Sequence, residues 1–452
     1  MPIAPPKAAS TLDDWLARVS RKEIRVGIVG LGYVGLPLTL LFSEQGIHVT
    51  GFDIDAQKVA TLNSGNSYIH RILPEHIAAA RAAGFTATSN FAEAAALDAI
   101  LICVPTPLHD DHTPDMSYVV STIEALAPHL RIGQLVVLES TTYPGTTEEI
   151  IAATIDRISS VKTLRASEAQ TLDGVMVAFS PEREDPGNIV TPRRDIPKVI
   201  GGIDARAGKA AAALYATVFH RTVSMSSTAA AEMTKLLENI YRCVNIALVN
   251  ELKQLCLHMG IDIWEVIDAA ATKPFGFQAF YPGPGVGGHC IPVDPFYLSW
   301  KAEQFGFATR FIELAGQVNE AMPAHVVAAT AKALAAAGKP LPGARILVLG
   351  VAYKKDVDDL RESPSLTIIE QLQEGGAAVS YNDPFFPTVG SGRKYQLNMA
   401  SAPLTGLAQF DAVVIATDHS TYDYDFIVAQ SKLVIDSRNA TRNIASSNIV
   451  RC

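Results

Sequence analysis

The chain has 452 residues, of which 48% are hydrophobic and 18% charged, and its formal net charge is −9. This length predicts two to four domains with large cores, and the acidic balance argues against nucleic acid or an anionic membrane as the main partner. No apolar run reaches the length of a membrane span. Five widely spread cysteines without a CxxC pair favour a reducing cytoplasm over a disulfide framework or a zinc site.

Residues 1–23 are expected to form a loose arm with a short helix at 12–19 and no signal-peptide core. The next thirty residues have the pattern of a dinucleotide site: a short apolar strand, the loop GLGYVG, a helix and a second strand. Gly30 allows the tight turn, Gly32 lets a pyrophosphate approach the backbone, and Gly35 lets helix and strand pack closely. A purely structural glycine turn is the alternative.

Asp53 follows Gly30 by 23 residues, where a carboxylate binds the ribose hydroxyls, so the pattern predicts NAD rather than NADP. Lys58 is expected to add a contact on the adenosine side, with a solvated helix face as the alternative. The predicted cofactor contacts of this region are Gly30, Gly32, Tyr33, Val34, Gly35, Asp53 and Lys58.

Further apolar strands are expected at 98–104, 135–139 and 175–179, and polar residues follow each of them. Ligands bind at the carboxyl ends of parallel strands, so Thr106 and Thr141 are predicted cofactor contacts. Helix N-capping is the alternative for both. The third strand leads into SPEREDPGN, where Glu182 is the candidate general base and a charged surface turn is the alternative.

Residues 228–259 are predicted to form one long helix, because helical periodicity continues without Pro or Gly until Gly260. Lys235, Asn239 and Arg242 are spaced four and three apart and share one face. Such a stripe can be a solvated face, or it can supply donors for an oxyanion and a phosphate. Helices are also expected at 261–271 and 297–310.

Cys290 lies in PGPGVGGHCIPVDP, a run too rich in Gly and Pro for a helix or a strand. Its glycines are expected to let a ligand approach the backbone. The cysteine is either a nucleophilic thiol or a small apolar residue in a turn. His289 is not expected to pair with it, because adjacent side chains in an extended loop point apart.

Residues 339–343 are predicted to be a linker, followed by a second strand–loop pattern that lacks GxGxxG. Lysines are expected to take over the role of the second and third glycines of GxGxxG, which suits a phosphate that is held by side chains. A degenerate copy that serves as a lid is the alternative. With strands expected at 377–381, 412–416 and 433–436, the chain is predicted to be an α/β protein with two Rossmann-like doubly wound domains, joined by a long central helix and a small helical domain.

The chain resembles the UDP-glucose/GDP-mannose dehydrogenase family through motifs that occur in the family's order: GLGYVGLP, PTP, ESTTYPGTT, SPEREDPGN, PGPGVGGHCIPVDP and AYKKDVDDLRES. The motifs are most similar to those of UDP-N-acetylglucosamine 6-dehydrogenases, and next to those of UDP-N-acetylmannosamine dehydrogenases. The resemblance implies a four-electron oxidation of the sugar C6 hydroxyl to a carboxylate, with two NAD reduced and one water consumed, for surface polysaccharide precursors. It also implies domains at 24–222 (NAD), 223–328 (central, dimerising, with the cysteine loop) and 339–452 (UDP-sugar).

By the same resemblance, Cys290 captures the aldehyde as a thiohemiacetal that becomes a thioester. Lys235 and Asn239 assist proton transfer and stabilise the oxyanion, Glu182 assists water, and Asp294 lies behind the cysteine loop. Arg361 is implied as a cofactor contact. The implied ligands of the UDP-sugar are Arg183, Lys235, Asn239, Arg242, Gly287 and Lys354, and no metal is implied.

One position departs from the family pattern. UDP-glucose enzymes of the family carry a basic residue three positions after the cysteine, where this chain has Val293. The sequence therefore leaves UDP-glucose and UDP-N-acetylmannosamine as alternatives to UDP-N-acetylglucosamine. A 3-hydroxyacid or decarboxylating dehydrogenase, and an inactive relative that senses NAD or a UDP-sugar, are the alternatives from other classes.

Overall fold

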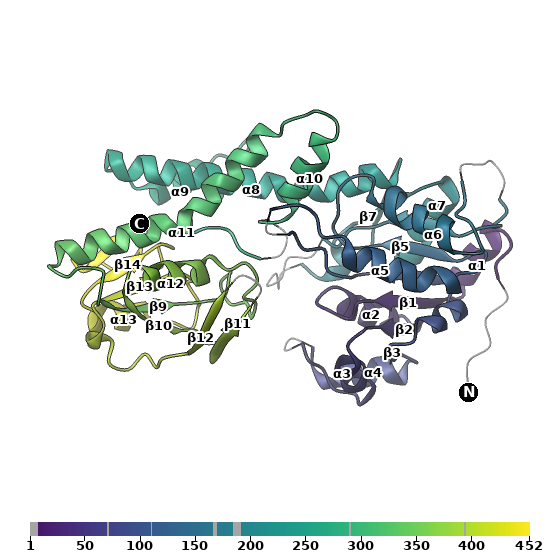
Figure 1. The fold of residues 1–452 in the computed structure, drawn as a ribbon, viewed down its shortest axis with the longest axis horizontal. Coiled ribbons are helices and arrows are strands. Elements are labelled where there is room, and N and C mark those ends of the chain that lie inside the picture. The colour runs from purple at the N-terminus through teal and green to yellow at the C-terminus, as the bar shows by residue number, and fades with distance from the viewer. Residues whose placement is uncertain are drawn as a thin grey trace. The chain divides into compact units, whose positions relative to one another are not determined.

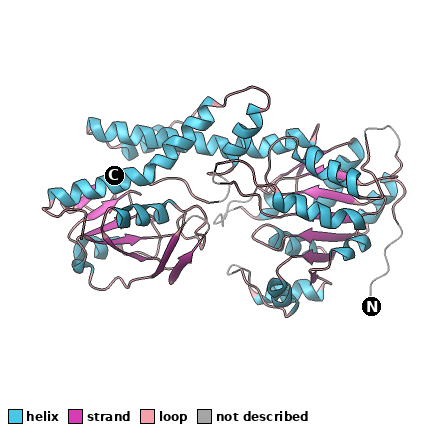
Figure 2. Cartoon of the chain, viewed as in Figure 1, coloured by secondary structure: helices cyan, strands magenta, loops and turns pink. Residues whose placement is uncertain are grey.

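The structure is a computed structural model that describes residues 8–69, 72–109, 111–165, 170–183, 191–288, 291–392 and 395–452. The chain divides into two compact units, Met1–Leu237 and Glu238–Cys452. Each unit contains a largely parallel sheet with helices on it, which confirms the predicted α/β class (Figures 1 and 2).

The sheet of the first unit has eight strands in the order β3-β2-β1-β4-β5-β6-β7-β8. Neighbours run parallel except β6 and β7, which are antiparallel. The order reverses direction between β1 and β4, which is the switch point where open α/β sheets bind ligands. The strands are β1 (Arg25–Val29), β2 (His48–Phe52), β3 (Thr86–Thr88), β4 (Ala99–Ile102), β5 (Leu135–Leu138), β6 (Met176–Phe179), β7 (Lys198–Gly202) and β8 (Thr222–Met225).

Strand residues alternate between two cores on the two faces of this sheet. Leu101 and Val137 face the core that α1, α2, α4 and α7 cover, whereas Ile100 and Val136 face the core that α5 and α6 cover. The expected helix at 12–19 therefore packs on the sheet and is part of the first unit's core. The helices are α1 (Leu12–Ser20), α2 (Gly35–Glu44), α3 (Ala56–Asn63), α4 (Pro74–Ala82), α5 (Ser117–Leu126), α6 (Ala153–Ile158) and α7 (Ala205–Tyr215).

Helix α8 (Thr228–Met259) has the predicted bounds, and the division between the two units falls inside it. The helices α9 (Ile263–Ala271), α10 (Asp294–Glu303) and α11 (Arg310–Ala336) follow. The expected helix at 297–310 is wrong at both ends. Asp294 and Pro295 begin α10, since proline suits the first turn of a helix, and Gly306 in a left-handed conformation lies between α10 and α11.

The second unit has a five-stranded parallel sheet in the order β10-β9-β13-β14-β15, with a separate hairpin of β11 and β12. Helices α11 and α12 cover one face, and α13 covers the other. The bounds are β9 (Arg345–Leu349), α12 (Pro364–Glu374), β10 (Ala378–Asn382), β11 (Thr388–Ser391), β12 (Gln396–Ala400), β13 (Ala412–Ile415), α13 (Tyr424–Gln430), β14 (Val434–Asp436) and β15 (Ile449–Arg451). Among the described residues, no helix is both long enough and apolar enough to span a bilayer.

Candidate active site

The loop after β1 has the backbone conformation that its glycines predict. Gly30 has a φ of 88°, and a Cβ on Gly35, the first residue of α2, would lie 2.0 Å from the carbonyl oxygen of Gly30. A Cβ on Gly32 would meet no described atom within 4 Å, so its bare backbone borders open space. No side chain caps α2 at its N-cap residue Val34, which leaves the positive end of the helix dipole for an anion.

Asp53 directly follows β2 and is 7% exposed. Its Oδ2 accepts the N–H of Leu31 at 3.1 Å and its Oδ1 accepts the N–H of Asp55 at 3.0 Å, so the carboxylate is fixed beside the glycine loop. Each oxygen keeps a further lone pair for a ribose hydroxyl. Lys58 Nζ lies 4.0 Å from Oδ2, and Tyr33 in the loop is half exposed. The turn and the carboxylate together fit NAD.

Thr106 and Thr141 connect the ends of β4 and β5, because the Thr106 hydroxyl donates to the carbonyl oxygen of Thr141 at 2.8 Å. Neither caps a helix, since the next helical segments have Met116 and Thr146 as their N-cap residues. The neighbouring Thr142 is fully buried, and its hydroxyl has no hydrogen-bond partner in the described part of the chain. Sequence reasoning overlooked Thr142, because burial cannot be distinguished within a run of hydroxyl residues.

Glu182 and Arg183 follow β6. The Arg183 N–H donates to Glu182 Oε1 at 2.8 Å, and Arg183 Nη1 donates to the carbonyl oxygen of Pro197 at 2.6 Å. Lys198 Nζ lies 3.7 Å from Glu182 Oε2, and the side chain of Glu182 is 19% exposed. Glu182 is therefore held against a buried cation that sequence reasoning missed. The rest of the acidic turn, 184–188, lies outside the described residues.

Lys235 on α8 is 5% exposed, and it has no hydrogen-bond or ion-pair partner within the described ranges. Glu232, one turn earlier, is fully buried and accepts the N–H groups of Gly145 at 2.6 Å and Thr147 at 2.9 Å. Burial raises the pKa of Glu232 despite these hydrogen bonds. Glu232 therefore fixes the rotation of α8 and with it the direction of Lys235. In the sequence, the signal for this role of Glu232 is its position three residues before Lys235.

Asn239, Arg242 and Asp294 form a chain of hydrogen bonds in the second unit. The Asn239 amide nitrogen donates to the Asp294 carboxylate, and the Asn239 amide oxygen accepts from the Arg242 guanidinium. Asn239 is fully buried and Asp294 is 1% exposed. The stripe on α8 is therefore not a solvated face at Asn239, and three of the predicted residues come together.

The glycine loop before α10 packs against Tyr353. A Cβ on Gly287 would lie 2.5 Å from the Tyr353 Cβ, and a Cβ on Gly288 would lie 3.0 Å from its ring. Here the glycines make room for a protein side chain, which differs from the expectation that they admit a ligand. His289 and Cys290 lie outside the described residues.

Lys354 and Arg361 also belong to the second unit, where Lys354 is partly exposed. The Arg361 guanidinium binds both oxygens of Asp359, with Nη2 2.7 Å from Oδ2 and Nε 3.0 Å from Oδ1. Their roles towards a UDP-sugar and a cofactor stay predictions.

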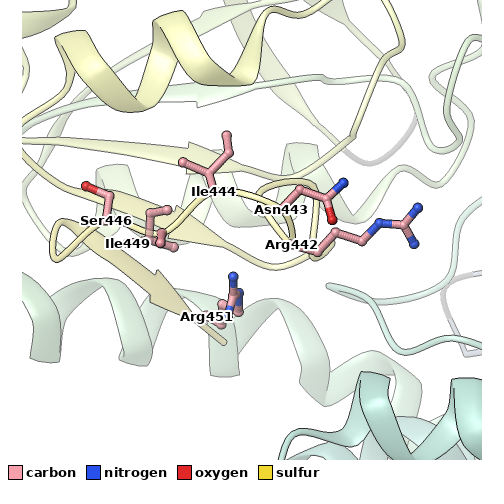
Figure 3. Close-up of a pocket in the computed structure, with 7 residues that line it drawn as sticks. Arg442, Asn443, Ile444, Ser446, Ile449 and Arg451 are labelled. Carbon is pink, nitrogen blue, oxygen red and sulfur yellow. The ribbon is translucent and has the colours of Figure 1, made fainter.

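A pocket of about 370 Å³ opens beside β15 in the second unit (Figure 3). None of the residues predicted from the sequence lines it. Two guanidinium groups make its lining suited to an anion, and the lining residues are Arg442, Asn443, Ile444, Ala445, Ser446, Ile449 and Arg451.

Three regions of the chain match models of one family. Residues 24–219 match the NAD binding domain of the UDP-glucose/GDP-mannose dehydrogenase family, residues 229–321 match its central domain, and residues 347–443 match its UDP binding domain. A hydroxyacid dehydrogenase has no use for this third domain, which excludes that alternative.

Whole-chain relatives agree. A UDP-N-acetyl-D-mannosamine dehydrogenase of Methanococcus maripaludis is 33% identical, with 92% of each chain covered. A UDP-N-acetyl-D-glucosamine 6-dehydrogenase of Pseudomonas aeruginosa is also 33% identical, over 89% of this chain and 92% of that one. The structure of a UDP-D-ManNAc dehydrogenase from Pyrococcus horikoshii superimposes with a TM-score of 0.83 at 32% identity, covering 95% of this chain and 98% of that one. The chain belongs to the UDP-glucose/GDP-mannose dehydrogenase family and is an NAD-dependent UDP-sugar dehydrogenase.

Proposed function

We propose that this enzyme oxidises the C6 hydroxyl of UDP-N-acetylglucosamine to the carboxylate, as a step towards surface polysaccharide precursors in the cytoplasm. The observation that carries the proposal is the hydrogen bond from Asn239 to Asp294. It joins α8, which bears the buried Lys235, to the residue four positions after Cys290. Asn239, four residues after Lys235 on α8, is thereby joined to the first residue of α10.

In this proposal the chain's own groups handle protons and the covalent bond. Lys235 and Asn239 donate hydrogen bonds to the C6 oxygen and stabilise its negative charge. The Cys290 thiolate adds to the aldehyde carbon while the carbonyl oxygen takes a proton, which gives the thiohemiacetal. Oxidation of that adduct leaves a thioester. Glu182 then takes a proton from the attacking water, and the C–S bond breaks with the Cys290 thiolate as the leaving group. The carboxylic acid that forms loses its remaining proton to solvent and is released as the carboxylate.

When bound, NAD would supply the electron acceptor for both oxidation steps, so two NAD would be reduced for each sugar. Gly30, Gly32 and Gly35 would hold the turn that receives its pyrophosphate, and Asp53 would bind the ribose hydroxyls. Thr106, Thr141 and Arg361 remain proposed further contacts, as do Arg183, Arg242 and Lys354 for the UDP-sugar.

The choice of sugar rests on the resemblance and on Val293. Val293 is 7% exposed and occupies the position where UDP-glucose enzymes of the family carry a basic residue, which argues against UDP-glucose. UDP-N-acetylmannosamine is the second candidate, because the M. maripaludis and P. horikoshii relatives are named for it.

The test is NADH formation with UDP-glucose, UDP-N-acetylglucosamine, UDP-N-acetylgalactosamine and UDP-N-acetylmannosamine. UDP-N-acetylglucosamine should give the highest kcat/KM, with two NADH for each sugar consumed. The variant Cys290→Ala should bind both ligands but lose sustained production of carboxylate. Preference for UDP-glucose would refute the choice of sugar, and carboxylate made by Cys290→Ala at the wild-type rate would refute the thioester route.

We also propose that two copies of the chain form a homodimer through α8. An apolar stripe spaced by three and four residues is left exposed on this helix: Leu248 (52%), Leu252 (37%), Leu255 (53%) and Met259 (61%). Light scattering on the purified protein should give twice the chain mass, and Leu252→Glu/Leu255→Glu should give the monomer. A monomeric wild type at micromolar concentration would refute this proposal.

A further inference from the structure

A buried ion pair lies beside Glu182 in the first unit. Lys198 Nζ is 2.5 Å from Glu139 Oε2, and the two side chains are 3% and 0% exposed. The Tyr215 hydroxyl donates to the other oxygen of Glu139. Burying two charges is costly, and an apolar pair of similar volume would be about as stable, so stability alone does not explain these residues.

The sheet topology explains why the cation meets Glu182. Glu139 directly follows β5, and Glu182 follows β6 after two residues, so both lie at the carboxyl edge of the sheet. Strand β7 runs antiparallel to β6, and its first residue, Lys198, is therefore returned to this same edge. A parallel strand would have placed its first residue at the opposite edge.

The Lys198 ammonium has three N–H donors, and each points in a different direction. One proton goes to Glu139, and a second goes to the carbonyl oxygen of Pro181 at 3.0 Å. This carbonyl belongs to the peptide bond that leads into Glu182. The third direction is towards Glu182 Oε2 at 3.7 Å. Lys198 thus contacts both the backbone and the charge of Glu182.

The surroundings keep Lys198 ionised. Burial alone would lower the pKa of Lys198, but the attraction of Glu139 and Glu182 outweighs it and raises the pKa above its usual value. The rings of Tyr215 and Phe219 lie 5.2 and 5.5 Å from Nζ. Cys103, after β4, also faces this cluster, and burial raises the pKa of its thiol well above the usual value, so it stays neutral.

We infer that Lys198 is a positioning residue for Glu182, which orients the carboxylate at the carboxyl edge of the sheet to accept the proton of the hydrolytic water. The inference rests on the proposed role of Glu182 and extends it. Lys198, whose side chain is 3% exposed, is inferred to act through Glu182 rather than on a ligand. Its anchor is Glu139, because an ammonium held on one side by a buried carboxylate cannot turn away from Glu182.

The test is a double-mutant cycle in the full-length enzyme. Lys198→Met/Glu139→Gln removes both charges together, so no buried charge is left unpaired. Methionine is an unbranched apolar side chain suited to contact with the two rings, and the amide oxygen introduced by Glu139→Gln can still accept from the Tyr215 hydroxyl. This double variant is made with and without Glu182→Gln, and kcat and KM are measured with NAD and the UDP-sugar that gives the highest turnover.

A matched control removes a different ion pair of the same unit. Asp98 binds Arg131 and Arg18, both at 2.9 Å, at the amino edge of the sheet just before β4. The variant Arg131→Met/Asp98→Asn removes this pair at the opposite edge of the sheet from Glu182, and it leaves Arg18, whose side chain is 12% exposed, without its carboxylate. Its kcat should stay within about twofold of wild type, while its melting temperature falls.

We expect Lys198→Met/Glu139→Gln to lower kcat by about 10- to 100-fold with KM changed by less than about twofold, because orientation is lost while binding is kept. In the Glu182→Gln background, the same pair should lower kcat by less than about twofold. Binding of the UDP-sugar without NAD, measured by calorimetry, should be unchanged.

If the fold loss in kcat from Lys198→Met/Glu139→Gln and that from Glu182→Gln multiplied in full, the inference would be overturned, because the pair would then act independently of Glu182. A loss of UDP-sugar affinity at unchanged kcat would also overturn it. A different result, wild-type kcat in Glu182→Gln alone, would overturn the proposed role of Glu182 itself, and so is distinguishable from failure of the inference.

Discussion

The two sheets carry the same turn after their first strand. Gly30 and Gly350 have φ values of 88° and 81°, and each N–H donates to the last residue of the neighbouring strand, β2 or β10. One residue later, the N–H groups of Leu31 and Val351 donate to a carboxylate that follows that strand. The shared geometry shows that this turn alone does not identify a cofactor site.

The two carboxylates differ in what else they bind. Asp383 is closed off: its Oδ2 also accepts from Ala352 and from His419 Nε2 at 3.1 Å, and its side chain is fully buried. His419 Nδ1 accepts the N–H of Asp356, which leaves the ring proton on Nε2 for Asp383. Asp53 has no such histidine partner among the described residues and keeps acceptors for a ligand. The second carboxylate is therefore structural, and the first is suited to binding.

The turns also differ five residues after the first glycine. Gly35 begins α2 at once, whereas Lys355 in the second unit is 48% exposed, and α12 begins only at Pro364. Lysines were expected in place of the second and third glycines. Counted from Gly350, the second position is instead Ala352, and only the third is a lysine. A helix N-terminus at the turn thus distinguishes a site for a dinucleotide from its copy.

The largest effect is expected from Gly35→Ala. Its methyl group would lie 2.0 Å from the carbonyl oxygen of Gly30, so α2 must shift away from the turn. NAD affinity should fall by more than about 100-fold, measured by calorimetry. The matched change Lys355→Ala should alter neither NAD affinity nor stability by more than about 0.5 kcal/mol. Equal effects of both changes would mean that the two turns are equivalent.

Asp383→Asn should destabilise the protein by about 3 kcal/mol, because an amide nitrogen would face backbone and His419 donors in a buried site. Urea unfolding followed by circular dichroism measures this loss. Asp53→Asn should cost about 1 kcal/mol, since its site is less crowded. If the order were reversed, Asp53 rather than Asp383 would be the structural carboxylate.

Asp53→Asn should instead weaken NAD binding by about 10- to 100-fold, because one charge-assisted hydrogen bond to the ribose is lost. Fluorescence or calorimetric titration measures the affinity, with Asp383→Asn compared in the same assay. Unchanged NAD affinity in Asp53→Asn would contradict the assignment of this turn to the cofactor.

The smallest effects, about 1 kcal/mol each, concern pH. Hydrogen bonds from His419 and the backbone lower the pKa of Asp383, although burial opposes them, so its contribution to stability is lost as pH falls below about 4. Burial raises the pKa of Glu232, so its contribution grows as pH falls towards the usual pKa of a glutamate. The stability advantage of wild type over Asp383→Asn should shrink in acid, and that over Glu232→Gln should grow. Parallel slopes in urea unfolding from about pH 7 to 3 would contradict this pair of predictions.

Local patterns in the sequence determined much of this protein. Short apolar strands, the turn made by Gly30 and Gly35, and the unbroken periodicity of α8 are decided by neighbours a few residues apart, and each was correctly predicted. The helix at 297–310 was misplaced because Pro295 and Gly306 act through caps that the apolar pattern does not show.

Only the tertiary structure decided which charged residues meet. Lys198 reaches Glu139 and Glu182 because β7 runs antiparallel to β6. Glu232 reaches the segment after β5 because the first turns of α8 lie against Gly145. Asp53 and Asp383 look alike in the sequence and differ because His419 lies beside only one of them. Burial and long-range pairing depend on how distant strands are ordered in the sheet, and a single sequence does not encode that order in any local pattern.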